Sequence, residues 1–70
     1  MNTKSSSVSY QGKQITVTAS QAGPELSAQV TSIAIDGQPV AFSPGDIEPG
    51  DTLDDAIDNG MRTAARMVDY

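Results

Sequence analysis

The chain has 70 residues and contains no cysteine, no histidine and no tryptophan. Without cysteine it can form neither a disulfide nor a thiolate metal site. Without histidine it lacks the side chain that most often acts as a general base or a metal ligand. No run of apolar residues approaches the ~18 that a membrane-spanning helix needs. We therefore expect a protein that is not an enzyme, with no catalytic residue, no metal, no cofactor and no membrane contact.

Basic residues are scarce as well, because four Lys+Arg stand against nine Asp+Glu and the net charge is −5. Binding to nucleic acid depends on Lys and Arg that neutralise phosphates, so we do not expect nucleic acid as a partner. The first seven residues are polar and rich in serine, and no apolar stretch of a secretory signal follows them. We expect a cytoplasmic protein in which residues 1–7 are a disordered lead-in and residues 8–70 form a single domain.

Alternating apolar residues indicate a strand in the first third of the chain. Residues 14–19 read Gln-Ile-Thr-Val-Thr-Ala, a period of two that is rich in β-branched residues. This pattern predicts one strand from about Tyr10 to Ala19. Gly12 could instead be the turn of a hairpin between two short strands. We favour the single strand, because the three residues before this turn would make a poor partner.

A second apolar run extends over residues 25–35, and its phase changes on the way. The even-numbered apolar residues end at Val30, whereas the next two are Ile33 and Ile35. A shift of one residue turns every following side chain to the other face of a sheet. A β-bulge near residues 31–32 would return both apolar sets to one face, and we predict such a bulge.

Turn residues divide the middle of the chain. Asp36-Gly37 between two apolar runs predicts a tight hairpin, since both central positions of a type I′ turn need positive φ. A third strand should run from Gln38 to about Phe42, with Pro39 marking it as an edge strand or a strand start. Residues 43–50 contain two prolines and two glycines and predict a loop.

The last segment predicts an amphipathic helix. Either Asp51 or Thr52 can cap its start, and Asp54 or Asp55 stands three residues later as the acidic partner of a capping box. Gly60 falls on the apolar stripe, where it can allow close approach to the sheet. The apolar residues recur at spacings of three and four, at Leu53, Ala56, Ile57, Gly60, Met61, Ala64, Met67 and Val68.

These elements predict an α+β fold, a three-stranded antiparallel meander sheet packed on one C-terminal helix. The sheet and the helix each have one apolar side, and each buries it against the other. The predicted core consists of Ile15, Val17, Leu26, Val30, Ile33, Ile35, Val40, Phe42, Leu53, Ile57, Met61, Ala64 and Val68.

Two polar surfaces are candidates for interaction. The sheet face away from the helix should carry Thr16, Thr18, Ser27, Gln29 and Thr31. Alternatively, this face is only the solvent-exposed side of a sheet that is buried on one side. Asp54, Asp55 and Asp58 at the start of the helix are the candidates for the second surface. They belong to an acidic cluster that also includes Asp46, Glu48 and Asp51. These acids could bind calcium, imitate the charge of a nucleic acid, or simply complement the helix dipole, and their spacing is not that of an EF-hand loop.

One stretch resembles a known family. Residues 50–59, Gly-Asp-Thr-Leu-Asp-Asp-Ala-Ile-Asp-Asn, are similar to the helix start of HicB-type antitoxins, and Gly23 with residues 26–30 is similar to a strand of that family. The resemblance implies a partial ribonuclease-H-like fold that blocks a small ribonuclease toxin. Asp36-Gly37 stands where the family has a Pro-x-Leu-Pro-Gly segment. Small bacterial domains with three strands and a helix share the same layout.

We therefore predict a small non-catalytic domain that acts through contact with a protein partner, with a homodimer as one form. The alternative is a HicB-like antitoxin or a nucleic-acid-associated regulator that uses its sheet surface.

Overall fold

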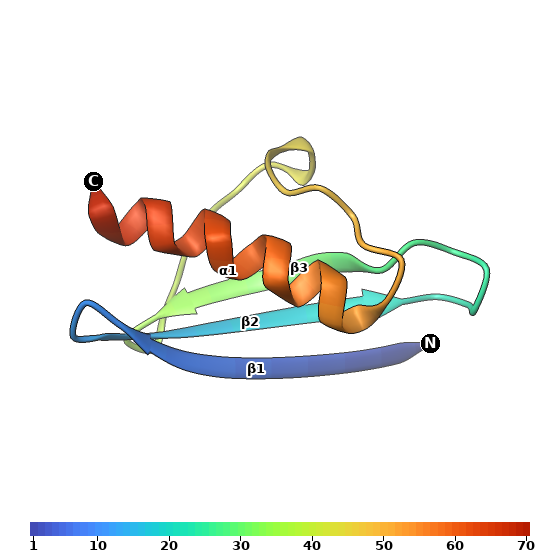
Figure 1. The fold of residues 1–70 in the computed structure, drawn as a ribbon, viewed down its shortest axis with the longest axis horizontal. Helices are drawn as coiled ribbons and strands as arrows, with labels where there is room; N and C mark the ends of the chain where they lie inside the picture. Colours follow the sequence, from blue (N-terminus) through green and yellow to red (C-terminus); the bar gives the residue numbers. More distant parts are fainter.

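In a computed structural model of the chain, which describes residues 1–70 apart from the side chain of Pro44, four strands form one sheet in chain order. Every neighbouring pair of strands is antiparallel, and the final helix lies across one face of the sheet (Figure 1). The predicted α+β class is confirmed. The elements are β1 (Asn2–Tyr10), β2 (Lys13–Gln21), β3 (Gln29–Ile35), β4 (Gln38–Pro39), a 3₁₀ turn (Pro44–Asp46) and α1 (Leu53–Asp69).

Strand β1 corrects the prediction for the start of the chain. Residues 2–7, predicted as a disordered lead-in, belong to this nine-residue strand, which pairs with β2 along its whole length. Gln11 and Gly12 have φ of 52° and 78° and form the turn between the two strands. The hairpin alternative is therefore correct, and the favoured single strand from Tyr10 to Ala19 is wrong. With residues 2–7 included, the strand before this turn has nine residues and is long enough to pair with all of β2.

The predicted bulge in β3 is confirmed. Thr18 of β2 faces Ser32 and Ala19 faces Val30, so Thr31 has no partner across the pair. The extra residue turns Val30 and Ile33 to the same side, where both contact the core.

The predicted start of this strand is wrong, because β3 begins at Gln29 and not at residue 25. Residues 22–26 form a turn in which the Leu26 N–H donates to the Gly23 carbonyl at 3.1 Å. Leu26 is 57% exposed and does not belong to the core.

The second hairpin forms at the predicted Asp36-Gly37 turn, where φ is 52° and 80°. Strand β4 is shorter than predicted, with only Gln38 and Pro39. The Val40 N–H still donates to the Ile33 carbonyl at 2.9 Å, and after that residue the chain leaves the sheet. Proline cannot donate to a ladder, which suits the edge position of β4.

Helix α1 begins at the predicted cap. The Thr52 hydroxyl accepts a hydrogen bond from the Asp55 N–H at 3.1 Å, and Leu53 is the first helical residue. Gly60 is buried against the sheet, and a Cβ at this position would lie 2.7 Å from Val17 Cγ1 and 2.9 Å from Val30 Cγ2. The expected role of Gly60 in close packing is confirmed.

The core lies between α1 and the adjacent face of β2 and β3. All predicted core residues except Leu26 contribute to it, and Ile15, Val17 and Ile33 are its largest fully buried side chains. The predicted core did not include the buried residues Ala19, Ala28, Ile47 and Ala56. The places of Ala28 and Ile47 depend on how the loops fold back. Among the described residues, no helix has the length and apolar character needed to cross a membrane.

Candidate functional site

Two of the predicted residues, Thr16 and Thr18, lie on the sheet face that the sequence predicted for them. Thr16 and Thr18 alternate along β2 with residues buried under the helix, so they lie on the opposite face. Their hydroxyls contact those of β1, with Ser7 Oγ 2.9 Å from Thr16 Oγ1 and Ser5 Oγ 2.8 Å from Thr18 Oγ1. This face therefore carries rows of paired hydroxyls.

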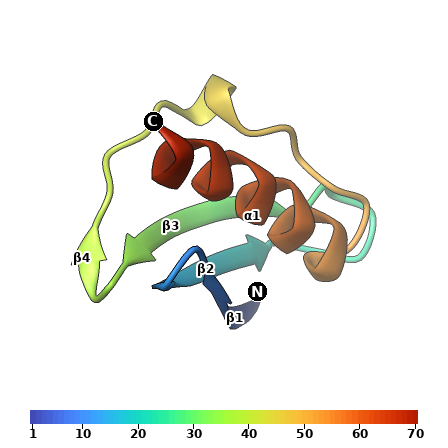
Figure 2. The same cartoon turned by 60° about the vertical axis from the view of Figure 1, so that its left-hand side comes forward.

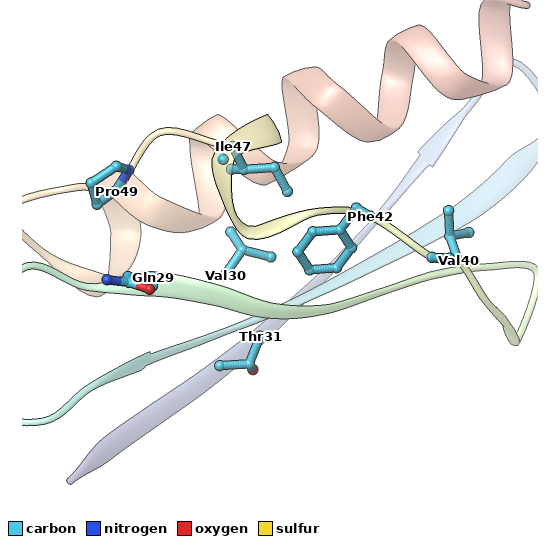
Figure 3. Close-up of a pocket in the computed structure, with 9 residues that line it drawn as sticks. Gln29, Val30, Thr31, Val40, Phe42, Ile47 and Pro49 are labelled. Atoms are coloured by element: carbon cyan, nitrogen blue, oxygen red, sulfur yellow. The ribbon is translucent and has the colours of Figure 1, made fainter.

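Gln29 and Thr31 belong to β3, on the side of the sheet away from β1, and lie next to a hollow. The Thr31 hydroxyl donates to the Thr18 carbonyl at 3.3 Å, which ties the bulge to β2. Both residues line an open hollow of about 650 Å³ between β3 and the loop that follows β4. Figure 3 shows the side chains of Val30 and Phe42 on the hollow side of β3, whereas the side chain of Thr31 points to the opposite side, so Thr31 lies at the border of the hollow.

The predicted acidic residues lie in the helix layer, away from Thr16 and Thr18. Asp54, Asp55 and Asp58 are exposed on the first turns of α1, where carboxylates complement the helix dipole. Within the described part of the chain, no cluster of three or more carboxylates is placed to hold a metal ion. The structure therefore does not join the threonines and the acids into one site.

The exposed edge of the sheet is the feature that sequence analysis missed. No described residue lies beyond β1 in the sheet, and both views show its outer side uncovered (Figures 1 and 2). Its signal in the sequence is faint, namely serine or threonine at every second position before a Gln-Gly pair. Most of these residues fall within the predicted disordered lead-in, residues 1–7.

The direction of the free backbone groups in β1 follows from the pairing of β2. The Gln14 carbonyl accepts from the Asp36 N–H and the Gln14 N–H donates to Asp36 Oδ1, so Gln14 directs both groups toward β3. Direction alternates along a strand, so the odd-numbered residues of β2 direct theirs toward β1. Their partners in β1 are the even-numbered residues. The odd-numbered residues, Thr3, Ser5, Ser7 and Ser9, therefore direct their N–H and C=O groups outward.

The opposite edge of the sheet is occupied at both ends by the chain itself, with the open hollow between the two contacts. Beyond β3 lie the short β4 with Pro39 and a loop that returns toward the sheet (Figure 2). Within this loop, Gly50 forms an isolated bridge with Ala28. Gly50 and Ala28 exchange two backbone hydrogen bonds, of 2.8 and 2.9 Å. Of the two edges, β1 is therefore the one that is open to a partner.

On the helix side, β1 is held at both ends by polar contacts to α1. Lys4 forms an ion pair with Asp54, and the Tyr10 hydroxyl donates to the two carboxylate oxygens of Asp69 at 3.0 and 2.9 Å. Between these contacts is a mostly apolar hollow of about 220 Å³ lined in part by Val8, Met61 and Ala65. Val8 is 48% exposed, so this hollow adjoins the open edge.

The contact with Asp69 also changes the acidity of Tyr10. The hydrogen bond to the carboxylate raises the pKa of the Tyr10 phenol above its ordinary value of 10.0, and desolvation and the negative charge of Asp69 act in the same direction. The neutral phenol is favoured in the folded chain. The stabilisation is therefore complete below pH 10 and is lost as the pH rises through the raised pKa.

We expect this shift to appear in the ultraviolet titration of tyrosinate. The variant Tyr70→Phe removes the other tyrosine, so its absorbance change reports Tyr10 alone, with a pKa above 10. Adding Asp69→Asn removes the charged acceptor and should lower that pKa. An unchanged midpoint in the double variant would mean that Asp69 does not hold the Tyr10 proton.

No protein-family model, curated protein or solved structure matches this chain, so a functional conclusion has to come from the geometry of the chain itself.

Proposed function

We propose that this chain is a small non-catalytic domain that acts through protein–protein contact, and that the open edge of β1 is its contact surface. The observation that supports the proposal is a nine-residue edge strand that contains no proline and pairs with β2 without a bulge. Natural edge strands usually carry a protective feature such as a proline or a bulge, because their unpaired backbone groups otherwise pair with another strand. An extended segment of a protein partner can add to this edge through backbone hydrogen bonds.

The charges favour a protein over a nucleic acid at this edge. Lys4, the one charged residue of β1, is paired with Asp54, and Lys13 lies 3.8 Å from Asp36. The other two cations, Arg62 and Arg66, are on α1. With a net charge of −5, the chain has no row of free cations along β1 to neutralise phosphates.

A substitution of Ser7 tests this function. Its N–H points outward, so Ser7→Pro removes a donor from the open edge without removing a bond to β2. Proline is tolerated at edge positions, and Ser7→Ala is the matched control because it also loses the hydroxyl contact to Thr16. With the chain as bait in cells that encode it, we expect Ser7→Ala to retain the same protein partners as the wild type and Ser7→Pro to lose them. Equal retention by both variants would count against the β1 edge.

The second candidate is a HicB-like antitoxin or a nucleic-acid-associated regulator. The three long strands β1, β2 and β3 precede α1, with the two-residue β4 between them, and this order is similar to the one that the resemblance implies. A small basic ribonuclease among the captured proteins would support the antitoxin form. A salt-dependent shift of RNA or DNA by the purified chain would support the regulator form.

A further inference from the structure

We propose that the partner of β1 is β1 of a second copy, paired antiparallel about Ser6, so that two sheets join into one. This inference rests on the proposed function, because it names the partner for the same edge. A two-fold axis through Ser6 makes both copies contribute the same strand, as in the commonest class of homodimer.

The outward backbone groups determine the register. Pairs that exchange two hydrogen bonds must join outward-directed residues, which in β1 are the odd-numbered ones. A two-fold axis at Ser6 sets Thr3 opposite Ser9 and Ser5 opposite Ser7. This register uses all four outward-directed residues of each copy, for about eight backbone hydrogen bonds. Any other antiparallel register leaves at least one of them without a partner.

The side chains of β1 suit a copy of the same strand. On the hydroxyl face, Thr3, Ser5, Ser7 and Ser9 read almost the same in both directions, so hydroxyl again faces hydroxyl. Ser5 and Ser7 already contact the hydroxyls of Thr18 and Thr16 within the chain. Pairing two copies therefore continues these hydroxyl rows across the new junction.

On the helix face, the same register places Lys4 of one copy opposite Val8 of the other. Val8 is half exposed beside the apolar hollow, and the aliphatic stem of Lys4 can cover such a surface while its ammonium stays with Asp54 of its own chain. Like charges do not face each other, since Lys4 is the one charged residue of the strand. This arrangement covers apolar surface that the single chain leaves exposed.

The association itself can be measured on the purified chain by sedimentation equilibrium. We expect the wild type and Ser7→Ala to form dimers at tens of micromolar, and we expect Ser7→Pro to raise the dissociation constant at least tenfold. Circular dichroism establishes that the variants are folded. A wild type that stays monomeric at 100 μM would overturn the inference, because its free energy of association would then be weaker than roughly 5.5 kcal/mol.

A cysteine at the two-fold axis tests the register independently of the proline variant. Ser6 faces Ser6 of the other copy in a non-hydrogen-bonded pair, with Cα atoms about 4.5 Å apart, which is within the range of a disulfide. Ser6→Cys should therefore give a covalent dimer on mild oxidation, and the chain has no other cysteine. Ser9→Cys is the control, because its two copies would lie about 20 Å apart. Equal cross-linking of both variants, or of neither, would contradict this register.

The two proposals fail in different ways. A monomeric wild type whose capture of other proteins is lost in Ser7→Pro removes the second copy as the partner and keeps the β1 edge as the contact surface. A dimer that forms equally well in Ser7→Pro and Ser7→Ala overturns the pairing of two β1 strands, and the capture experiment then decides whether the edge binds another protein.

Discussion

Replacing Gly50 by alanine is expected to destabilise the fold by about 3 kcal/mol or more, at the upper end of the cost of overpacking. A Cβ on Gly50 would lie 2.5 Å from both the Ala56 nitrogen and Asp55 Cβ. These atoms belong to the first turn of α1, where helical hydrogen bonds fix the backbone. Gly50 cannot move away easily either, because it exchanges two hydrogen bonds with Ala28. A domain of this size has a total stability of only about 3–5 kcal/mol, so much of the variant should be unfolded at 25 °C.

Urea denaturation followed by circular dichroism measures this loss. Gly45→Ala is the matched control in the same loop, since a Cβ there meets no atom within 4 Å and the φ of Gly45 is not positive. We expect Gly45→Ala to remain within about 0.5 kcal/mol of the wild type. If Gly50→Ala is equally harmless, then the contact between Gly50 and the start of α1 is looser than the structure describes.

The elements that sequence analysis predicted well are those whose signals lie within a few residues of the element. Helix α1 has its cap at Thr52 and its apolar stripe in consecutive turns, and the second hairpin needs only Asp36 and Gly37. The bulge at Thr31 was predictable too, because the apolar positions before and after it lie in the same strand and their change of phase is visible in the sequence. None of these features requires knowledge of which segment lies alongside.

The elements that were missed depend on such knowledge. Residues 2–7 have little apolar character, so composition alone favours disorder. They form a strand because β2 offers a partner of equal length and hydroxyls that face theirs. The candidate site shows the same division. Alternation placed Thr16 and Thr18 on the outer face, whereas the open edge of β1 is a property of strand order and cannot be found in any single strand.

Leu26 and Ile33 were both predicted to be core residues, but only Ile33 is buried in the structure. Both fall on the apolar side of the predicted strand, but Ile33 is 1% exposed and Leu26 is 57% exposed. The difference arises because the turn over residues 22–26 removes Leu26 from the sheet, while the bulge at Thr31 returns Ile33 to the face under α1. The two positions therefore make a matched pair for a truncation experiment.

Truncation of Ile33 to alanine is expected to cost about 2–5 kcal/mol, because the cavity left among stiff neighbours such as Val17 collapses only in part. Leu26→Ala removes a side chain of the same size and should change the free energy of unfolding by less than about 0.5 kcal/mol. Urea denaturation of both variants under identical conditions gives the comparison. Equal losses would mean that Leu26 packs into the core and that β3 starts near residue 25 after all. A loss confined to Ile33 would place the core where the bulge directs it, between β2, β3 and α1.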